Sequence, residues 1–245
     1  RGYQDFNNKV ILITGGSRGL GAEFVKSLSA DEGNLVFYTY SDASSGCQPR
    51  GNVTPLLCNQ KNEPEIIGCV AEIIGAQGKI DVLVNNACPV FRPCGLTDSD
   101  WSMFQELIDV NVKGAYVFMR EAARSMMQNG SGRIVNILSS YVLGVPPEKL
   151  SFYITAKYAL AGLSRAAAAE FCKHGITVNM ISPGMMDTRL TGYLPARYLE
   201  AYRQKHPLNR MTTPADVAEV LRFLISDSAQ FINGANIPVN GGEAF

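Results

Sequence analysis

Tyr153 and Lys157, in the stretch YITAK, are four residues apart, and on a helix this spacing puts both side chains on one face. A free phenol titrates near 10, and lowering its pKa to about 7 for acid–base chemistry requires roughly 4 kcal/mol. A lysine ammonium at about 4 Å supplies ~4 kcal/mol at an effective dielectric constant near 20, but only ~1 kcal/mol in open water. The pair can therefore do this chemistry only in a partly dry cleft, and without further context such a pair is usually a solvated helix face.

A second candidate for ligand binding is TGGSRGLG, residues 14–21, which follows the apolar run VILI. A strand, a turn containing Gly15, Gly19 and Gly21, and an amphipathic helix form the setting in which helix amides bind a pyrophosphate. Only glycine lets a ligand approach the backbone closely. The spacing is G-x-x-x-G-x-G rather than the usual G-x-G-x-x-G, and a glycine-rich turn alone can be purely structural.

Short apolar segments alternate with helical ones along the chain, and several are apolar on both faces, as in a parallel sheet covered on both sides. The expected strands are Val10–Thr14, Leu35–Tyr40, Thr54–Leu57, Asp81–Asn85, Arg133–Leu138, Thr177–Ser182 and Asn236–Val239. With no linker or repeat to divide residues 1–245, we expect a single doubly wound α/β domain of the Rossmann type with a seven-stranded parallel sheet.

Three helices have sequence signals at their ends. One carries an apolar face from Leu20 to Leu28, with Gly33 as its expected stop. A capping box at Thr97-x-x-Asp100 is expected to open a long helix toward Gln128. A third is expected from Pro214 to Ile225. Residues 185–210 carry no strand pattern, which predicts a helical excursion, a substrate lid, over the sheet edge.

Composition excludes several classes of function. The net charge is zero and the pI is about 6.9, which gives no electrostatic case for nucleic acid. No apolar run approaches the roughly 18–20 residues that span a bilayer, and the N-terminus lacks the apolar core of a signal peptide. The six cysteines are dispersed without a C-x-x-C pair. We therefore expect no metal site and no membrane association, and a reduced cytoplasmic protein.

Together these motifs resemble the short-chain dehydrogenase/reductase family over nearly the whole chain. Residues 14–21 resemble its cofactor loop, and NNA at 85–87 resembles the segment that steadies the central sheet beside the adenosine. Asn111 in DVNVKG, Tyr153 and Lys157 resemble its catalytic residues. SPGMMDT resembles its turn beside the nicotinamide, through Pro183, Gly184 and Thr188. Residues 214–242 resemble its final helix and strand, with PADVAEVLRFLI and IPVNGG.

The resemblance implies hydride transfer between nicotinamide C4 and a substrate carbonyl carbon. Tyr153 would donate the proton, while Lys157 would lower the pKa of Tyr153 and hold the nicotinamide ribose. A serine would hydrogen-bond the carbonyl oxygen, and Asn111 would support a water that relays protons to Lys157. This combines general acid catalysis with preorganised electrostatics.

Two serines are candidates for the carbonyl contact. Ser140 lies thirteen residues before Tyr153, the commoner interval in the family, whereas Ser139 lies six after Arg133, the usual position at the end of the fifth strand. Register in a buried strand is stiff, while a loop absorbs an extra residue at little cost. We therefore favour Ser139 and keep Ser140 as the alternative.

Cofactor choice depends on the end of the second strand, where NAD-preferring members usually carry an acid. The alignment places Thr39 there, followed by Tyr40 and Ser41, while Asp42 comes too late. Arg18 resembles the basic residue that meets a 2′-phosphate, so we expect NADPH/NADP⁺. Asn59 stands where the family often has an Asp beside the adenine. The expected cofactor-binding residues are Gly15, Ser17, Arg18, Gly19, Leu20, Gly21, Thr39, Tyr40, Ser41, Asn59, Asn85, Ala87, Tyr153, Lys157, Pro183, Gly184 and Thr188.

The sequence departs from the family pattern at two positions. Cys88 stands where NNAG has its glycine, and a side chain there would strain or narrow the site if the backbone needs a positive φ. We expect a tolerated substitution. Asn240 replaces a more usual Asp, and we derive no effect from it.

The overall pattern is closest to 3-oxoacyl-[acyl carrier protein] reductases, which implies a substrate on an acyl carrier protein and a basic patch to receive it. The alternatives are a free small ketone, polyketide, sugar or sterol-like alcohol, or a non-catalytic NADP(H)-binding protein. A homodimer or homotetramer is expected through the helices near Thr97 and Tyr153 and the last helix and strand. Candidate pocket residues are Val90, Phe91, Val142, Leu143, Pro146, Met185, Met186, Leu190 and Tyr193, and candidate basic residues are Arg92, Arg189, Arg197, Arg203 and Lys205.

Overall fold

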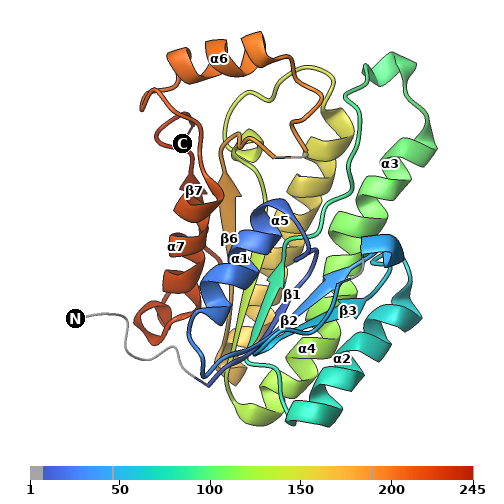
Figure 1. Cartoon of the computed structure of the whole chain (residues 1–245), viewed down its shortest axis with the longest axis vertical. Helices are drawn as coiled ribbons and strands as arrows, with labels where there is room; N and C mark the ends of the chain where they lie inside the picture. The colour runs from blue at the N-terminus through green and yellow to red at the C-terminus, as the bar shows by residue number, and fades with distance from the viewer. Residues whose placement is uncertain (1–7, 46, 189, 245) are drawn as a thin grey trace.

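The computed structural model describes residues 8–45, 47–188 and 190–244, which build a sheet with helices on both faces (Figure 1). The sheet has seven parallel strands in the order β3-β2-β1-β4-β5-β6-β7, which confirms the doubly wound Rossmann-type fold. The strands are β1 (Val10–Ile13), β2 (Leu35–Tyr40), β3 (Val53–Leu57), β4 (Val82–Asn85), β5 (Gly132–Ile137), β6 (Ile176–Pro183) and β7 (Asn236–Val239).

Helices cover the two faces of this sheet unequally. They are α1 (Gly19–Ser29), α2 (Glu63–Gln77), α3 (Trp101–Ile108), α4 (Ala115–Asn129), α5 (Ser151–Phe171), α6 (Ala196–Lys205) and α7 (Pro214–Ile225). One apolar core joins the sheet to α1 and α7, and the other joins it to α2, α4 and α5. None of these helices is both long and apolar enough to cross a bilayer, within the residues described.

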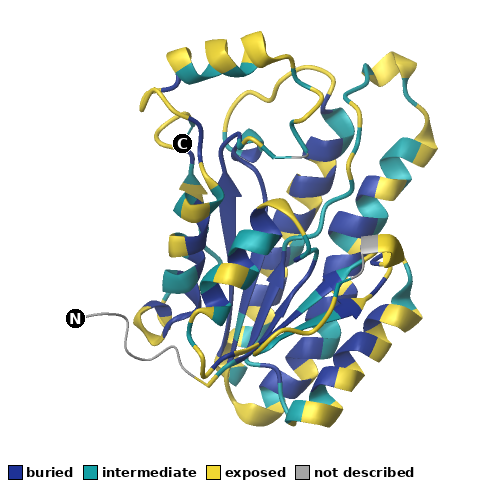
Figure 2. Ribbon diagram, viewed as in Figure 1, coloured by how far each residue is buried: buried dark blue, intermediate teal, exposed yellow. Residues whose placement is uncertain are grey.

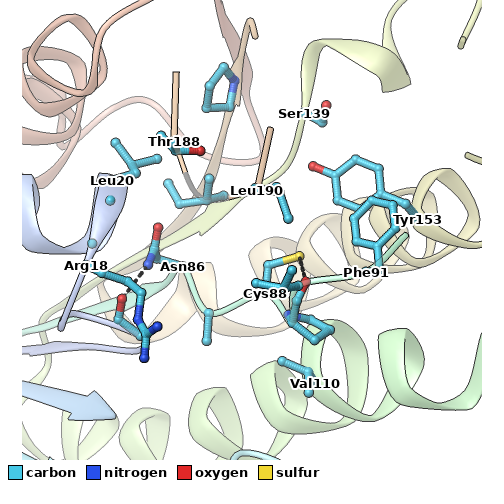
Figure 3. Close-up of a pocket in the computed structure, with 18 of the residues that line it drawn as sticks. Arg18, Leu20, Asn86, Cys88, Phe91, Val110, Ser139, Tyr153, Thr188 and Leu190 are labelled. Carbon is cyan, nitrogen blue, oxygen red and sulfur yellow. Dashed lines mark hydrogen bonds between the residues drawn. The ribbon is translucent and has the colours of Figure 1, made fainter. Parts of the chain in front are cut away.

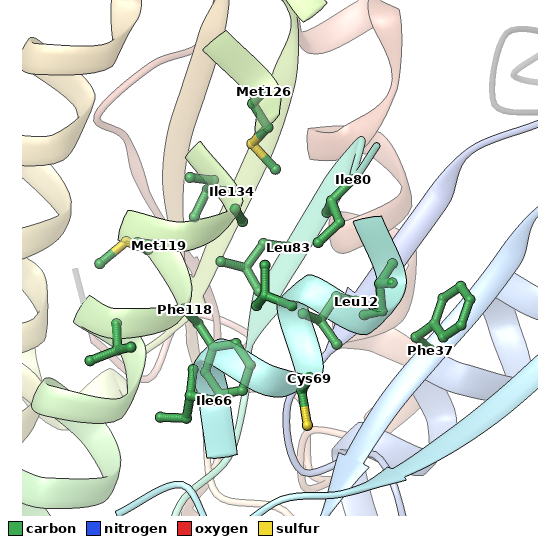
Figure 4. Packing of buried hydrophobic residues seen from close by; sticks show 14 of the residues in the cluster. Leu12, Phe37, Ile66, Cys69, Ile80, Leu83, Phe118, Met119, Met126 and Ile134 are labelled. Atoms are coloured by element: carbon green, nitrogen blue, oxygen red, sulfur yellow. The ribbon is translucent and has the colours of Figure 1, made fainter. Parts of the chain in front are cut away.

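Alternate residues of each strand enter different cores, as a two-residue period requires. Ile11 and Ile13 of β1 pack with Phe24 of α1, while Leu12 between them packs with Phe118 of α4 (Figure 4). Burying such side chains contributes roughly 1.5–3 kcal/mol each. The central strands β1, β4, β5 and β6 are almost wholly buried, β2, β3 and β7 are partly exposed, and the outer helix faces are exposed (Figure 2). This double core makes the sheet a rigid platform for the loops at the carboxyl ends of its strands.

The expected stop of the first helix at Gly33 is wrong. The helix α1 ends at Ser29, and its terminal turn is completed by a side chain rather than by a glycine. The buried amide of Asn34 donates to the carbonyl of Leu28 at 3.1 Å, which supplies the partner that the helix end lacks.

The expected capping box at Thr97 is wrong, whereas the long helix toward Gln128 is confirmed, with a π-helical turn inside it. Thr97 lies in a short 3₁₀ turn, and α3 begins at Trp101 because the Asp100 carboxylate accepts the N–H of Met103 at 3.1 Å. A π-helical turn, Asp109–Gly114, then separates α3 from α4. Such turns occur mostly at functional sites, and this one carries Asn111.

The last helix and the excursion agree with the expectations. Thr213 and Asp216 form a reciprocal capping box at the start of α7, immediately before Pro214. Residues 185–210 contain α6 and no strand within the described residues, and Figure 1 shows α6 beyond the carboxyl ends of the strands.

Candidate active site

A cleft of about 600 Å³ lies at the carboxyl ends of the strands. The strand order places β1 between β2 and β4, so the connections leaving β1 and β4 run to opposite faces and open a crevice between them. The glycine loop, the end of β2, the segment after β4, the end of β5, the start of α5 and residues 183–194 contribute to its walls. Fifteen expected site residues line it, namely Gly15, Ser17, Arg18, Gly19, Leu20, Gly21, Thr39, Tyr40, Ser41, Asn59, Ala87, Pro183, Gly184, Thr188 and Ser139, together with the pair Tyr153 and Lys157.

The three glycines of the loop have different reasons to be glycine. A Cβ on Gly15 (φ +66°) would lie 2.9 Å from the Cα of Ala87, and one on Gly21 would collide with the carbonyl oxygen of Gly15. Gly19 also has a positive φ, +55°. A Cβ placed on it would meet only the Cβ of Thr188, at 3.9 Å, and both residues line the cleft. Two glycines therefore serve packing, while Gly19 presents bare backbone to the cleft.

The start of α1 beside Gly19 fits a phosphate. Its N-cap is Arg18 in extended conformation, which makes no side-chain cap, and its first turn has no acidic residue. The unsatisfied amides and the positive end of the helix dipole thus remain available for an anion. These residues fit the diphosphate of a nicotinamide dinucleotide.

Thr14 joins the glycine loop to the end of β4. Its Oγ1 accepts the backbone N–H groups of Asn86 and Ala87, both at 3.0 Å. In return the Asn86 amide donates to the carbonyls of Thr14 and Gly15, at 3.0 and 3.1 Å (Figure 3). These bonds between residues over 70 positions apart fix the shape of the loop.

Asn85 does not line the cleft, which corrects its placement among the cofactor-contacting residues. Its side chain is buried behind the wall and donates to the Oδ1 of Asn136 on the neighbouring strand β5 at 2.8 Å. The side chain that reaches the wall is Asn86, because successive residues at the end of a strand point to opposite sides. The double asparagine of NNA was the signal that could have identified it.

Tyr153 and Lys157 lie one turn apart on α5, and both side chains are buried. The Nζ of Lys157 donates to the carbonyl of Ile137, at the end of β5, at 2.9 Å and lies 5.6 Å from the centroid of the Tyr153 ring. Phe91 stacks on the ring of Tyr153, with centroids 5.0 Å apart. The pair therefore occupies the dry setting that its chemistry requires.

The same dryness acts on both titrating groups. Burial raises the pKa of Tyr153 well above its ordinary value, and burial lowers the pKa of Lys157. Desolvation disfavours phenolate and ammonium alike, so burial outweighs any lowering of the Tyr153 pKa by Lys157, whose role stays a prediction. A hydrogen bond with Ser139 acts against the rise in the Tyr153 pKa. The phenol is accordingly kept protonated.

Both candidate serines are buried and line the cleft. Ser139 has an extended backbone, and its hydroxyl accepts the N–H of Tyr141 at 3.3 Å. In Figure 3 the Ser139 side chain lies near the Tyr153 hydroxyl, in agreement with the hydrogen bond between the two residues. This placement favours Ser139 for the carbonyl contact, and its role stays a prediction.

Asn111 lies behind the cleft wall rather than on it. Its amide donates to the carbonyl of Leu107 at 3.0 Å, while its buried Oδ1 has no hydrogen-bond partner among the described residues. Its amide also faces the thiol of Cys88, and both Asn111 and Lys157 act against the burial that raises the Cys88 pKa. Asn111 is thus placed to reach Lys157 only through an intermediary, as a relay role would require.

Cys88 is accommodated without backbone strain. It is not among the non-glycine residues with a positive φ, and its half-buried thiol donates to the carbonyl of Pro89 at 3.6 Å. The thiol lines the cleft beside Phe91 and Tyr153 (Figure 3), so it narrows the cleft there. The second departure, Asn240, ties the chain end together by donating to the carbonyl of Ala244 at 2.8 Å.

The opposite end of the cleft is lined by the residues that the sequence predicts for the adenosine end of the cofactor. Arg18, Tyr40 and Ser41 line it, and Thr39 accepts the N–H of Gly15 at 3.1 Å. Asp42 lies off the wall and accepts hydrogen bonds from Ser44. Asn59 also lines the cleft, with its Oδ1 accepting the N–H of Lys61 at 3.1 Å.

The substrate end differs in part from the expectation. Val142 is core, packed with Leu138 and Leu160, and Leu143 packs beside it, while Pro146 is exposed. These three residues do not line the cleft, because the chain turns into the core after Tyr141. The residues that do are Val90, Phe91, Met185, Met186, Leu190 and Tyr193, as expected, and also Tyr141, Leu150, Thr191 and Leu194.

Of the basic side chains expected to form a patch, one is engaged in ion pairs and three are exposed to solvent. Arg203 is paired with Glu200 at 3.3 Å and lies 3.9 Å from Asp187, whereas Arg92, Arg197 and Lys205 are exposed. Arg189 lies outside the described residues. Within the described residues no group of three metal-ligating side chains forms a metal site.

Comparisons with known proteins agree with this geometry. Residues 15–243 match the family described as enoyl-(acyl carrier protein) reductase. The chain is 34% identical to a 3-oxoacyl-[acyl-carrier-protein] reductase FabG of Rickettsia felis, over 97% of this chain and 98% of that one. It is 32% identical to a 2,5-dichloro-2,5-cyclohexadiene-1,4-diol dehydrogenase of Sphingobium indicum, over 97% and 98%.

A solved structure of similar fold is that of a 3-ketoacyl-(acyl-carrier-protein) reductase from Brucella melitensis complexed with NADH. It has a TM-score of 0.91 and 26% identity, and the match covers 98% of this chain and 100% of that one. The chain belongs to the short-chain dehydrogenase/reductase family. It is an oxidoreductase of CH–OH and C=O groups that uses a nicotinamide cofactor.

Proposed function

We propose that the protein is an NADPH-dependent ketoreductase whose substrate is a 3-oxoacyl thioester carried by an acyl carrier protein. The observation that carries the proposal is the buried Tyr153 phenol, kept protonated in the cleft beside Ser139 and Lys157. A protonated phenol is the form that a ketone needs as it becomes an alcohol. The similarity to 3-oxoacyl-[acyl-carrier-protein] reductases supports the substrate class.

The bound nicotinamide supplies the hydride. Ser139 orients the substrate carbonyl by a hydrogen bond, and Tyr153 donates its proton to the oxygen as negative charge develops there. Lys157 binds the cofactor ribose and is held in place by the carbonyl of Ile137. Asn111, from behind the wall, supports the water through which the proton on Tyr153 is replaced.

NADPH rather than NADH is supported by charge. Arg18 lines the adenosine end of the cleft. The residues that line it at the end of β2 and just after it, Thr39, Tyr40 and Ser41, carry no carboxylate. A guanidinium binds a phosphate with short, charge-assisted hydrogen bonds. Ser17, Leu20 and Gly21 of the loop would contact the diphosphate, and Pro183, Gly184 and Thr188 the nicotinamide.

A free ketone of compact shape is the second candidate substrate. Phe91 and Tyr153 are stacked, and with Met185 and Tyr193 they give the substrate end an aromatic and apolar lining that a ring would fill. The names of two similar proteins support this candidate. They are a solved levodione reductase, with a TM-score of 0.90 and 26% identity, and the Sphingobium diol dehydrogenase. We propose residues 185–210 as the lid for either substrate.

Assembly and compartment follow from other features. We propose a homodimer or homotetramer built on α4 and α5, because Tyr116 and Tyr158 expose 45% and 53% of their surfaces there. All six cysteines are free thiols, which supports a reducing, cytoplasmic compartment.

The test is a substrate panel followed by NADPH absorbance. Acetoacetyl-carrier protein and free cyclic ketones are compared with NADPH and NADH, using the wild type and Tyr153→Phe. The proposal expects preferred turnover of the carrier thioester with NADPH, and a loss of about 10²–10⁴-fold in Tyr153→Phe with NADPH binding retained. Turnover of free ketones alone would favour the second candidate. Binding of NADP(H) without turnover of any ketone would favour a non-catalytic binding protein.

A further inference from the structure

The chain end is fastened to the lid helix α6. The hydroxyl of Tyr202, on α6, donates to the Oε2 of Glu243 at 2.6 Å. His206, just beyond α6, is buried, and its Nε2 lies 2.9 Å from the carbonyl oxygen of Asn240. A Cβ on Gly241 would lie 2.6 Å from the His206 ring, so the two segments pack without room to spare. Figure 1 shows the chain after β7 below α6, at the end of the sheet where the strands have their carboxyl ends.

The same chain end also lies beside the segment that follows the cleft-lining residue Tyr141. A Cβ on Gly144 would lie 3.6 Å from the Cβ of Ala244, so residues 243–244 lie beside the loop that carries Tyr141. Tyr141 lines the cleft, and the negative charge of Glu243 is close enough to contribute to the rise in its pKa. Tyr202 in turn interacts with the backbone of Met185, another lining residue.

The carboxylate of Glu243 can accept further hydrogen bonds. An ionised carboxylate offers about four lone-pair sites, and Tyr202 occupies one of them on Oε2. Glu243 is exposed, and Tyr193 and Tyr198 of the lid add further hydroxyl groups near Tyr141. A group that donates a hydrogen bond suits this position, whereas an anionic group does not.

We propose that Glu243, held by Tyr202 beside Tyr141, is the acceptor of a substrate-tail subsite that binds amide N–H or hydroxyl groups trailing from the reacting ketone. The inference rests on the proposed ketoreductase function and names the part of the substrate that Glu243, which lies outside the cleft lining next to Tyr141, recognises. An acyl thioester on an amide-containing arm and a free ketone with a distal hydroxyl share this chemistry.

Four probes separate this subsite from the reaction itself. They are the acetoacetyl thioesters and the acetoacetyl oxygen esters that carry either a 2-acetamidoethyl tail, with one N–H, or a pentyl tail, with none. Each is reduced by the wild type, Glu243→Ala, Glu243→Gln and Tyr202→Phe, with the exposed Glu219→Ala on α7 as matched control.

The proposal expects Glu243→Ala to lower kcat/KM for the amide tail about tenfold, through KM, because one hydrogen bond to a charged acceptor is lost. The pentyl tail, the dissociation constant of NADPH and the Glu219→Ala enzyme change less than about twofold, within the scatter of independent surface sites. Glu243→Gln keeps a neutral acceptor and restores part of the loss. Tyr202→Phe removes the hydrogen bond that holds the Glu243 carboxylate. Its kcat/KM for the amide tail is expected to lie between those of Glu243→Ala and the wild type.

Equal losses on both tails would mean that Glu243 only holds the lid, and the subsite would be rejected. No loss on either tail would reject it as well. Reduction of the oxygen esters but of neither thioester would overturn the carrier-thioester function, while the ester pair would still decide whether Glu243 reads the tail.

Discussion

The ring of Phe91 lies nearly parallel to the ring of Tyr153, with centroids 5.0 Å apart and planes inclined by 20°. The two residues come from separate elements, the segment after β4 and the helix α5. Phe91 thereby shields one surface of the phenol from water. Since desolvation is the main reason that the Tyr153 pKa is raised, Phe91 helps to set the protonation state of the proposed acid.

Removing this shield should change the pH dependence of reduction. A raised pKa keeps the phenol protonated, so activity that needs the proton falls only as the pH rises through that pKa. In Phe91→Ala water reaches Tyr153, its pKa falls toward the ordinary value of about 10, and the alkaline limb of kcat/KM moves to lower pH. Profiles between about pH 6 and pH 10.5 measure this, with Phe91→Leu as a control that keeps most of the burial. An unshifted limb in Phe91→Ala would show that other groups keep the phenol dry.

The choice between the two serines can be decided by paired substitutions. Ser139→Ala should lower kcat by about 10²-fold, because it removes a hydrogen bond to the oxygen that gains charge. Ser140→Ala should leave kcat within a few-fold of the wild type. NADPH binding, followed by fluorescence, is expected to survive both changes. If only Ser140→Ala loses turnover, the assignment of Ser139 is reversed.

Arg18 should determine the preference for NADPH. Arg18→Gln removes the guanidinium from the adenosine end, and losing charge-assisted hydrogen bonds to a phosphate costs roughly 10- to 100-fold in kcat/KM for NADPH. The NADH reaction serves as the internal control and should change little. Raising the salt concentration should weaken NADPH binding in the wild type more than in the variant. A parallel loss with both cofactors would contradict the role.

The exposed backbone at Gly19 should be needed for the cofactor and not only for the fold. Gly19→Ala places a methyl group in the cleft and forces an alanine into a left-handed conformation, at a cost of about 1 kcal/mol. Gly130→Ala, at the end of α4, imposes a similar conformation (φ +64° against +55°) where a Cβ meets nothing within 4 Å. Both variants should lose similar thermal stability, measured by calorimetry. Only Gly19→Ala should raise the dissociation constant of NADPH, and equal constants would refute a diphosphate contact there.

The sheet was predictable from the sequence because fully buried strands leave continuous apolar runs. The predicted strand ends agree with the structure to within about two residues, as for Asp81–Asn85 against β4. The start of α7 was equally predictable, since a threonine, a proline and an aspartate form a local capping motif there.

The features that sequence reasoning missed depend on contacts between distant residues. The end of α1 is set by Asn34, whose side chain had no helical or strand signal. The π-helical turn around Asn111 leaves no mark in the apolar pattern, because one added residue is within the scatter of a helical face. The raised pKa of Tyr153 follows from how deeply the pair is buried, which spacing along a helix cannot reveal.

The bonds between Thr14 and the Asn86–Ala87 backbone have a consequence for biosynthesis. The glycine loop is translated early, but the two amides that hold its threonine emerge from the ribosome only after some seventy further residues. A nascent chain released before Val82 lacks both donors and the strand β4 beside which β1 must lie. Coenzyme therefore cannot help to order the glycine loop before Asn86 and Ala87 have been synthesised.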